Sequence, residues 1–389
     1  MLITVHTLRR LVLMCLFVAL VGCTAEPDLR SGAGAGTPDV VGIRKVIALV
    51  PDTQSAKEIR NAARAAGYQE LAATHLNGLG LSMLTFRMPK GVTGAEAIAE
   101  LEAAVPASTV GINHAYRLQQ SSVPPDGLDY AGTMIRWGKD GCRARAPIGM
   151  IDTGIDTTSP ALVNAQIRTR SFFAGSAAPA DHGTNVATVL AGPNRLRDAT
   201  IFSANVFGQS DTQGLKAGAD ALVRALDWLA EEDVRFVNLA LAGPYNKLLD
   251  LAVDRATSRG LILVAAVGNE GPQVDPLYPA GFDRVIAVTA VDAQSRIYRK
   301  AVRGPHVDVA APGVDVLVPS GRGARFVTGT SIATPFVTAR LAADASLATT
   351  QDVSMVRRRL AATSADLGRN GRDRTFGYGL VLADETCGN

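Results

Sequence analysis

Three short stretches of this chain carry the residue types that hydrolytic chemistry uses. Asp152 ends the apolar run of IGMIDTGID, His182 lies at the start of DHGTNVATVLAG, and Ser331 lies in TGTSIATPFVTA. A serine hydroxyl can act as a nucleophile, an imidazole can accept and return its proton, and a buried carboxylate can orient the imidazole. Together the stretches predict a serine hydrolase site, although Ser331 alone could simply cap a helix.

Asn269, in LVAAVGNEGP, is the candidate fourth member of this site. It follows a buried strand-like run, where a side-chain amide can donate to a developing oxyanion together with the Ser331 backbone N–H. The alternative is an asparagine that only shapes a glycine turn. Asp156 competes with Asp152 for the role of acid, but it follows Gly154 in a turn, so we interpret it as a loop residue.

Length and composition allow such a site to be housed in a folded body. The chain has 389 residues, of which 47% are hydrophobic and 19% charged, which fits a globular protein of two or three units. Its formal charge of +3 includes Arg9 and Arg10, so without them it is +3 − 2 = +1. A chain so nearly neutral lacks the basic footprint of a nucleic-acid-binding protein, and no nucleic-acid partner is predicted.

The chain begins with a pattern typical of export. Two arginines precede an apolar run, Leu11 to Val21, that is too short to span a bilayer. Residues 1–22 are therefore predicted to be a signal peptide. The sequence Leu-Val-Gly-Cys that ends at Cys23 resembles the lipobox of bacterial lipoproteins, which implies lipidation of Cys23 and a membrane partner through that lipid. An ordinary signal peptide is the alternative.

That resemblance also implies an address in the bacterial cell envelope. Thr24, rather than aspartate, follows the cysteine, which favours the outer membrane facing the periplasm. Residues 23–42 are rich in Gly, Ala and Pro without hydrophobic period, and they are predicted to be a flexible tether.

Residues 43–120 alternate strand-like and helical patterns in the order β-α-β-β-α-β, with helices over Ser55 to Gly67 and Gly94 to Val105 and a last strand over Thr109 to Tyr116. This order predicts a small α+β, ferredoxin-like domain. Residues 121–137 are predicted to be a connector that contains the processing site, and its first part, SSVPPDG (residues 121–127), is predicted to be exposed.

Residues 138–389 alternate buried strand-like runs with amphipathic helical segments, including Ala217 to Ala230 and Lys247 to Arg259. The pattern predicts a doubly wound α/β fold with a parallel sheet covered on both faces. Asp152 would then stand at the carboxyl edge of that sheet, where open α/β folds place their sites. Ser331 would start a helix, with Pro335 in its first turn.

Cys142 and Cys387 are the two cysteines that remain for the folded part once Cys15 and Cys23 are assigned to the export signal. In an oxidising compartment they suggest a disulfide between the two ends of one domain, the alternative being two unpaired thiols.

The order Asp, His, Ser and the motifs around these residues resemble the catalytic domain of the subtilase superfamily, over about Ile148 to Asp384. The resemblance implies a serine endopeptidase that acts through an acyl-enzyme. It also implies that residues 43–120 are an inhibitory prodomain, with His114 structural rather than catalytic, and that the chain cuts itself between Tyr116 and Gly132. Peptide substrates would add as a strand along Leu239, Ala240 and Leu241, near Gly243.

Several positions depart from the family pattern. Asn185 and Phe336 stand where histidines are common, and Leu277 falls near the base of the primary specificity pocket, from which we expect a preference for small side chains. The loop that holds calcium in many subtilases is missing from LAGPNRLRDATIFSANVF, so no cofactor and no metal are predicted. The competing hypotheses are an inactive or prodomain-locked binding module and an esterase.

Overall fold

The computed structural model describes residues 40–42, 44–118, 129–173, 175–210, 214–320, 323–383 and 387. They belong to one compact unit, Thr37–Asn389. The predicted signal peptide, Cys23, most of the tether, and residues 119–128, which include the first part of the connector, lie outside the described residues.

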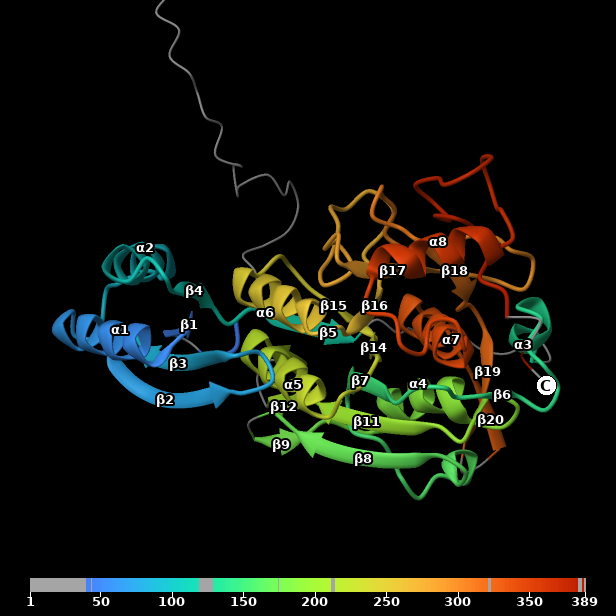
Figure 1. Ribbon diagram of the computed structural model, residues 1–389, viewed down its shortest axis with the longest axis horizontal. Helices are drawn as coiled ribbons and strands as arrows, with labels where there is room; N and C mark the ends of the chain where they lie inside the picture. Colours follow the sequence, from blue (N-terminus) through green and yellow to red (C-terminus); the bar gives the residue numbers. More distant parts are fainter. Residues whose placement is uncertain are drawn as a thin grey trace, which may run out of the picture. The chain divides into compact units, whose positions relative to one another are not determined.

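The N-terminal domain has the predicted β-α-β-β-α-β order. Its elements are β1 (Lys45–Val50), α1 (Thr53–Ala65), β2 (Gln69–Leu76), β3 (Leu81–Arg87), α2 (Gly94–Ala104) and β4 (Thr109–Ile112). The strands form an antiparallel sheet in the order β2-β3-β1-β4, which is the ferredoxin-like arrangement (Figure 1). Asp52 caps α1 through the Ser55 N–H, and Thr93 with Glu96 forms a capping box on α2, so the local sequence sets both helix starts.

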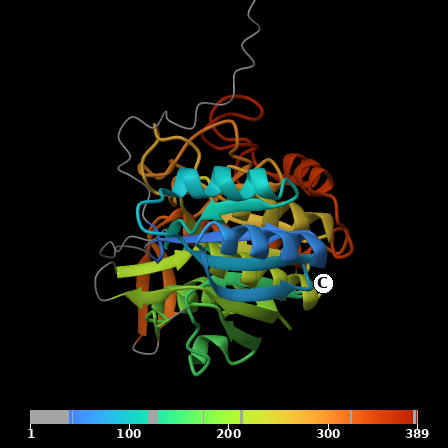
Figure 2. The ribbon, with the colours of Figure 1, turned by 90° about the vertical axis from the view of Figure 1, so that its left-hand side faces the viewer.

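Alternating side chains give this small sheet two apolar faces. Val46, Ala48 and Val50 of β1 pack in a cluster with residues of α1 and α2, the two helices drawn in blue and cyan in Figure 2. Ile47 and Leu49, between them in the chain, belong instead to a cluster shared with α5 (Ala219–Glu231) and α6 (Lys247–Ser258). The second face therefore joins the N-terminal domain to the rest of the molecule through a continuous hydrophobic core.

The last predicted strand of this domain, Thr109 to Tyr116, is broken in the structure. β4 ends at Ile112, the backbone turns at Asn113, and a separate strand, β5 (Ala115–Leu118), leaves the small sheet. Before it, Val40 forms a bridge with His114, so the end of the predicted tether is part of the folded body.

The larger domain is built on a seven-stranded parallel sheet in the order β18-β17-β16-β14-β7-β11-β8. This confirms the predicted subtilisin-like, doubly wound α/β fold. The strands are β7 (Ile148–Asp152), β8 (Gln166–Ser171), β11 (Thr200–Asn205), β14 (Phe236–Leu239), β16 (Ile262–Ala266), β17 (Val285–Val291) and β18 (Val309–Pro312).

Helices cover both faces of this sheet (Figure 1). On β16, Leu263 and Ala265 face the cluster that contains α5 and α6. Ile262 and Val264 face the cluster that contains α4 (Asp181–Ala191) and α7 (Thr330–Ala343). Burial on both faces explains why these strands read as continuous apolar runs in the sequence.

Smaller elements complete the domain. They are α3 (Ala131–Met134), β6 (Cys142–Arg143), the short 3-10 turn Pro160–Leu162, β9 (Ser176–Ala177), β10 (Leu196–Arg197), β12 (Gly208–Ser210), β13 (Gly214–Gly218), β15 (Leu241–Ala242), β19 (Val316–Ser320), β20 (Gly323–Val327) and α8 (Val353–Thr363). In the second half of the predicted connector, Ala131, Ile135 and Trp137 are buried in the core. The folded body thus starts before residue 138.

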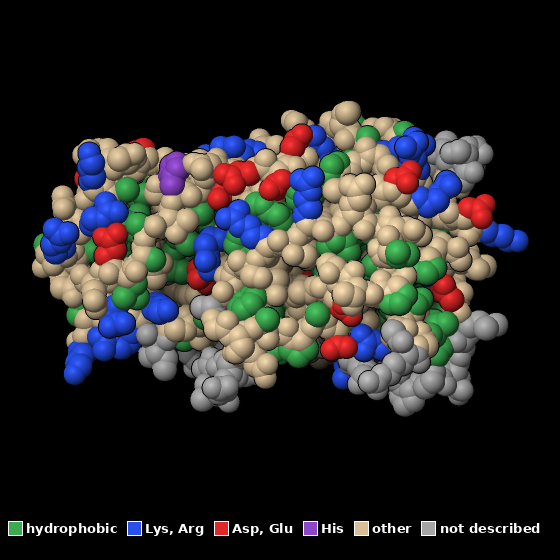
Figure 3. Space-filling model, turned by 90° about the horizontal axis from the view of Figure 1, so that it is seen from below, with side chains coloured by type: hydrophobic (Ala, Val, Ile, Leu, Met, Phe, Trp, Pro, Cys, Tyr) green, Lys and Arg blue, Asp and Glu red, His purple; other side chains and the backbone are tan. Residues whose placement is uncertain are grey.

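The surface and helices of the described part give two further observations. On the face seen in Figure 3, basic and acidic side chains both occur among neutral ones. None of the described helices is long and apolar enough to cross a bilayer.

Candidate active site

The carboxylate of Asp152 stands at the carboxyl end of β7, the strand flanked by β11 and β14 in the middle of the sheet. Asp152 is fully buried. Its Oδ1 accepts a hydrogen bond from the Thr153 backbone N–H at 2.6 Å and lies 2.6 Å from Nδ1 of His182. The competitor Asp156 is exposed and bonded to Thr158, as expected of a loop residue.

His182 is the second residue of α4 and joins the other two candidates. Its Nδ1 faces Asp152, and its Nε2 lies 3.2 Å from Oγ of Ser331. The following residue, Gly183, lets α4 begin this close to β7: its N–H bonds Oγ1 of Thr153, and a Cβ there would lie 2.6 Å or less from the carbonyl oxygens of Thr153 and Gly154. Glycine at this position is therefore a packing requirement of the site.

Ser331 is the second residue of α7 and is fully buried. Its place in the first turn confirms the expected helix start. Pro335, however, lies in the second turn, not the first, since the helix begins at Thr330. Its missing N–H removes the helical hydrogen bond that would otherwise reach the Ser331 carbonyl, which is a local cost within the helix that carries the candidate nucleophile.

Asn269 follows β16 at the same edge of the sheet and is held by α7. Its Oδ1 accepts hydrogen bonds from the backbone N–H and the hydroxyl of Thr330, at 3.2 and 3.0 Å. The Thr330 hydroxyl in turn accepts from the Gly268 N–H. Because the amide oxygen is bound to Thr330, the amide nitrogen is the end of the Asn269 side chain that can donate to an oxyanion.

Thr330 and Thr153 are two supporting residues that the sequence reasoning did not single out. Each lies next to a candidate triad member in the sequence, and this proximity is the feature by which the sequence could have indicated them. Their hydroxyls fix neighbouring groups whose position the local sequence pattern cannot specify.

A strand of the N-terminal domain lies along the predicted substrate groove. β5 pairs antiparallel with β13 on one side, Tyr116 opposite Ala217, and with β15 on the other, Leu118 opposite Leu241. The ring of Tyr116 is fully buried against Gly243, where a Cβ would come within 2.6 Å of it.

Only some of the predicted groove residues contact β5. Leu241 pairs with β5, and Gly243 lies under Tyr116. Leu239 instead belongs to β14 and is paired on both sides within the central sheet, so it has no edge to offer a substrate. Ala240, fully buried, joins the two strands. The prediction for Leu239 was wrong because the chain passes from the central sheet (β14) to the groove strand (β15) between Leu239 and Leu241.

Leu277 packs against Gly268, the residue before Asn269. Its Cδ1 would lie only 2.5 Å from a Cβ built on Gly268, which has φ +102°. The leucine side chain thus rests directly on the backbone that precedes Asn269.

The comparisons with known proteins agree with this geometry. The model of the subtilase family matches residues 145–379, more than half of the chain. The chain belongs to the subtilase family. Subtilisin DY of Bacillus licheniformis is 33% identical over 250 residues, 61% of this chain and 89% of that protein. The minor extracellular protease Epr of Bacillus subtilis is 28% identical over 60% of this chain and 37% of its own length. The subtilase family implies serine endopeptidase activity.

Among solved structures, this subtilase resembles fervidolysin of Fervidobacterium pennivorans, a keratinolytic enzyme related to subtilisin. The TM-score is 0.71 at 20% identity, over 90% of this chain and 62% of that chain. At this identity the likeness concerns the fold alone.

Proposed function

We propose that this subtilase is a serine endopeptidase made as a self-processing zymogen and anchored to a membrane by lipid. The observation that carries the proposal is the relay from Asp152 through both ring nitrogens of His182 to Oγ of Ser331, at 2.6 and 3.2 Å. Such a relay, at the carboxyl edge of a parallel sheet and beside an amide donor, is what acyl transfer requires.

In this proposal His182 takes the proton of Ser331 as the hydroxyl attacks the carbonyl of a peptide bond. Asp152 holds the imidazole in the correct tautomer and stabilises the imidazolium that forms. Asn269 donates to the oxyanion of the tetrahedral intermediate. His182 then returns the proton to the leaving amine, and water repeats the cycle on the acyl-enzyme.

The N-terminal domain would be the inhibitory prodomain of this enzyme. β5 supports this assignment, because it adds as a strand between β13 and β15 in the way expected of a peptide substrate. Residues 115–118 are paired and residues 131–134 form α3, so of the range predicted for self-cleavage we favour the bonds between residues 119 and 129. Most of that stretch lies outside the described residues.

For the cleaved position we propose a preference for small side chains. The packing of Leu277 against Gly268 supports it, since this leucine fills space beside Asn269 that a larger substrate side chain would need. Lipidation of Cys23 and an outer-membrane address rest on the sequence alone.

The deciding experiment combines fluorophosphonate labelling with intact mass, for the exported wild type and for Ser331→Ala. We expect a truncated, labelled wild type beside a full-length, unlabelled variant, and an added acyl mass on Cys23 before processing. Full-length, unlabelled protein in both would favour the locked or inactive module. Labelling with turnover of esters but not of peptides would favour an esterase.

A further inference from the structure

Asn113 lies where the chain leaves the sheet of the N-terminal domain and enters the predicted substrate groove. It occupies the break between β4 and β5, at which the His114 N–H bonds back to the Ile112 carbonyl. Although it is a polar residue in a turn, Asn113 is only 4% exposed. A buried amide needs partners for both its oxygen and its nitrogen.

Asp220, 107 residues further along the chain, supplies both partners. The Asn113 Nδ2 donates to Oδ1 of Asp220 at 2.7 Å, and the Asp220 backbone N–H donates to Oδ1 of Asn113 at 3.1 Å. Beside them the Ala219 N–H donates to the His114 carbonyl. The N-cap of α5, Gly218, makes no side-chain cap of its own, so the N-terminal domain provides the cap from outside the helix.

The shape of the contact is as restrictive as its hydrogen bonds. A Cβ on Gly218 would come within 2.8 Å of both polar atoms of the Asn113 amide. The glycine lets the amide lie flat against the start of α5, while β5 continues from there into the groove with Ala115 opposite Gly218.

The chemistry of this pair favours asparagine over aspartate. An amide offers one donor and one acceptor, which match the carboxylate and the N–H of Asp220. An aspartate in its place would set a carboxylate oxygen about 2.7 Å from the Asp220 carboxylate, with like charges in contact. Arg224, 3.3 Å from Asp220, is shared with the Phe172 carbonyl, and the side chains of Lys45 and Lys216 line the same cavity as the pair.

We propose that Asp220 is a specificity-determining residue that selects asparagine over aspartate in the chain bound to the groove. The recognised residue stands three positions before the residue whose side chain packs on Gly243. In this chain these two residues are Asn113 and Tyr116. The recognition of Asn113 rests on the structure, whereas its extension to substrates rests on the proposed endopeptidase function.

The first test needs no catalysis and uses the full chain with Ser331→Ala. Hydrogen exchange is followed in peptides covering residues 214–222 for N113D, D220N and the double variant N113D/D220N. Each single change should speed exchange about tenfold, because N113D removes the donor to the Asp220 carboxylate and D220N replaces that charged acceptor with a neutral amide. The double variant should regain protection, since the new amide can donate to the new carboxylate. Glu231→Gln, which removes an exposed charge from the end of the same helix, should change nothing there.

Protection lost in the single variants and not regained in the double would overturn the recognition of Asn113 by Asp220. Circular dichroism of all four proteins shows whether a variant has simply unfolded. If N113D alone does not fold, the recognition of Asn113 by Asp220 can still be tested by comparing D220N with N113D/D220N. Residues 214–222 should exchange more slowly in the double variant.

The second test measures kcat/KM of the processed enzyme for quenched peptides spanning residues 110–128, with Asn or Asp at position 113. We expect about a tenfold preference for Asn in the wild type and a preference for Asp in Asp220→Asn. The same ratio in both enzymes would overturn the extension to substrates. If the wild type cleaves neither peptide, the proposed function fails, while the exchange experiment still decides the contact.

Discussion

At the residue scale, the site depends on small side chains that allow close approach and on hydroxyls that hold neighbours in place. Gly183 brings α4 against the end of β7, and Thr330 ties Asn269 to the helix that carries Ser331. A change at either kind of position would act on catalysis by moving a group that itself touches the reacting atoms.

Asn269→Ala should lower kcat about 100- to 1,000-fold with little change in KM. The expected size comes from removal of an oxyanion-hole asparagine in subtilisin, a relative of this protein and the measured case on which the estimate rests. Steady-state kinetics on one peptide would check it. Thr330→Val is the matched control, which should give a smaller loss because the amide remains but is less well held. An unchanged kcat in Asn269→Ala would remove this residue from the site.

Leu277→Gly should change which side chain is accepted at the cleaved position. The leucine packs on Gly268, so its removal opens space beside Asn269. We expect kcat/KM for a peptide with Phe there to rise at least about tenfold, while that for Ala changes little, given about 0.8 kcal/mol for each buried methylene. Profiling both enzymes on a peptide library is the measurement. Preference of the wild type for Phe or Tyr would contradict the pocket assignment.

At the element scale, α5 is the helix on which the two domains meet. Asn113 binds near its start, and Asp227, two turns further on, accepts a hydrogen bond from the Leu79 N–H in the β2–β3 turn at 2.9 Å. Asp227 is 9% exposed, and burial raises its pKa to about 6, with Glu231 adding repulsion and the backbone hydrogen bonds opposing the rise.

This raised pKa predicts a pH-dependent stability. Because the folded-state pKa of about 6 exceeds the ordinary 3.8, the contribution of Asp227 is full below pH 4 and is lost as the pH rises through 6. Asp227→Asn cannot ionise, so relative to the parent its free energy of unfolding should gain on the order of 2 kcal/mol between pH 4 and pH 8.

Urea unfolding of Asp227→Asn and its parent, both with Ser331→Ala to prevent self-digestion, would measure this difference across the pH range. Asp233→Asn, beyond the end of the same helix, is the control. A stability difference that stays flat from pH 4 to pH 8 would show that Asp227 does not titrate with a raised pKa.

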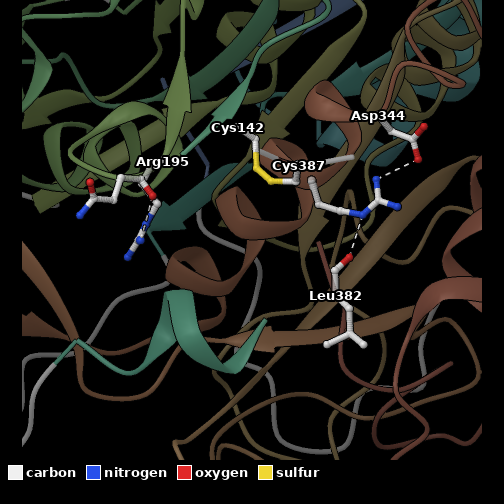
Figure 4. The surroundings of a disulfide bond; sticks show 7 residues. Cys142, Arg195, Asp344, Leu382 and Cys387 are labelled. Carbon is white, nitrogen blue, oxygen red and sulfur yellow. Dashed lines mark hydrogen bonds and ion pairs between the residues drawn. A yellow bond between two sulfur atoms is a disulfide. The ribbon is translucent and has the colours of Figure 1, made fainter. Parts of the chain in front are cut away.

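At the scale of the whole molecule, a disulfide links positions 245 residues apart. Cys142 in β6 pairs with Cys387, their Cα atoms 4.9 Å apart, in the surroundings drawn in Figure 4. Nearby, Arg340 of α7 donates to the Leu382 carbonyl and pairs with Asp344. The end of the chain is thus joined to the segment that follows the predicted processing region.

The double variant Cys142→Ala/Cys387→Ala should lose about 2 to 4 kcal/mol of unfolding free energy, because the unfolded chain is no longer constrained by the cross-link. Denaturant unfolding with and without dithiothreitol measures it, again with Ser331→Ala. Reductant should lower the parent to the level of the variant and leave the variant unchanged. Equal stability of the parent under both conditions would argue against a stabilising cross-link.

The sequence by itself determined the elements and the candidate chemistry. Apolar runs and helical periods are local, and they predicted the two folds and their helix positions to within a few residues. Asp152, His182, Ser331 and Asn269 could be named because each stands at the end of a strand or the start of a helix within a distinctive motif, and parallel strands bring such ends to one edge.

Only the tertiary structure decided what those elements do to one another. Nothing local distinguishes Leu239, paired inside the sheet, from Leu241, paired with β5. The turn at Asn113 interrupts a strand-like pattern because its amide binds Asp220, a residue far along the chain. Contacts of this kind depend on how separate segments pack, and a pattern read within one segment contains no information about its distant partner.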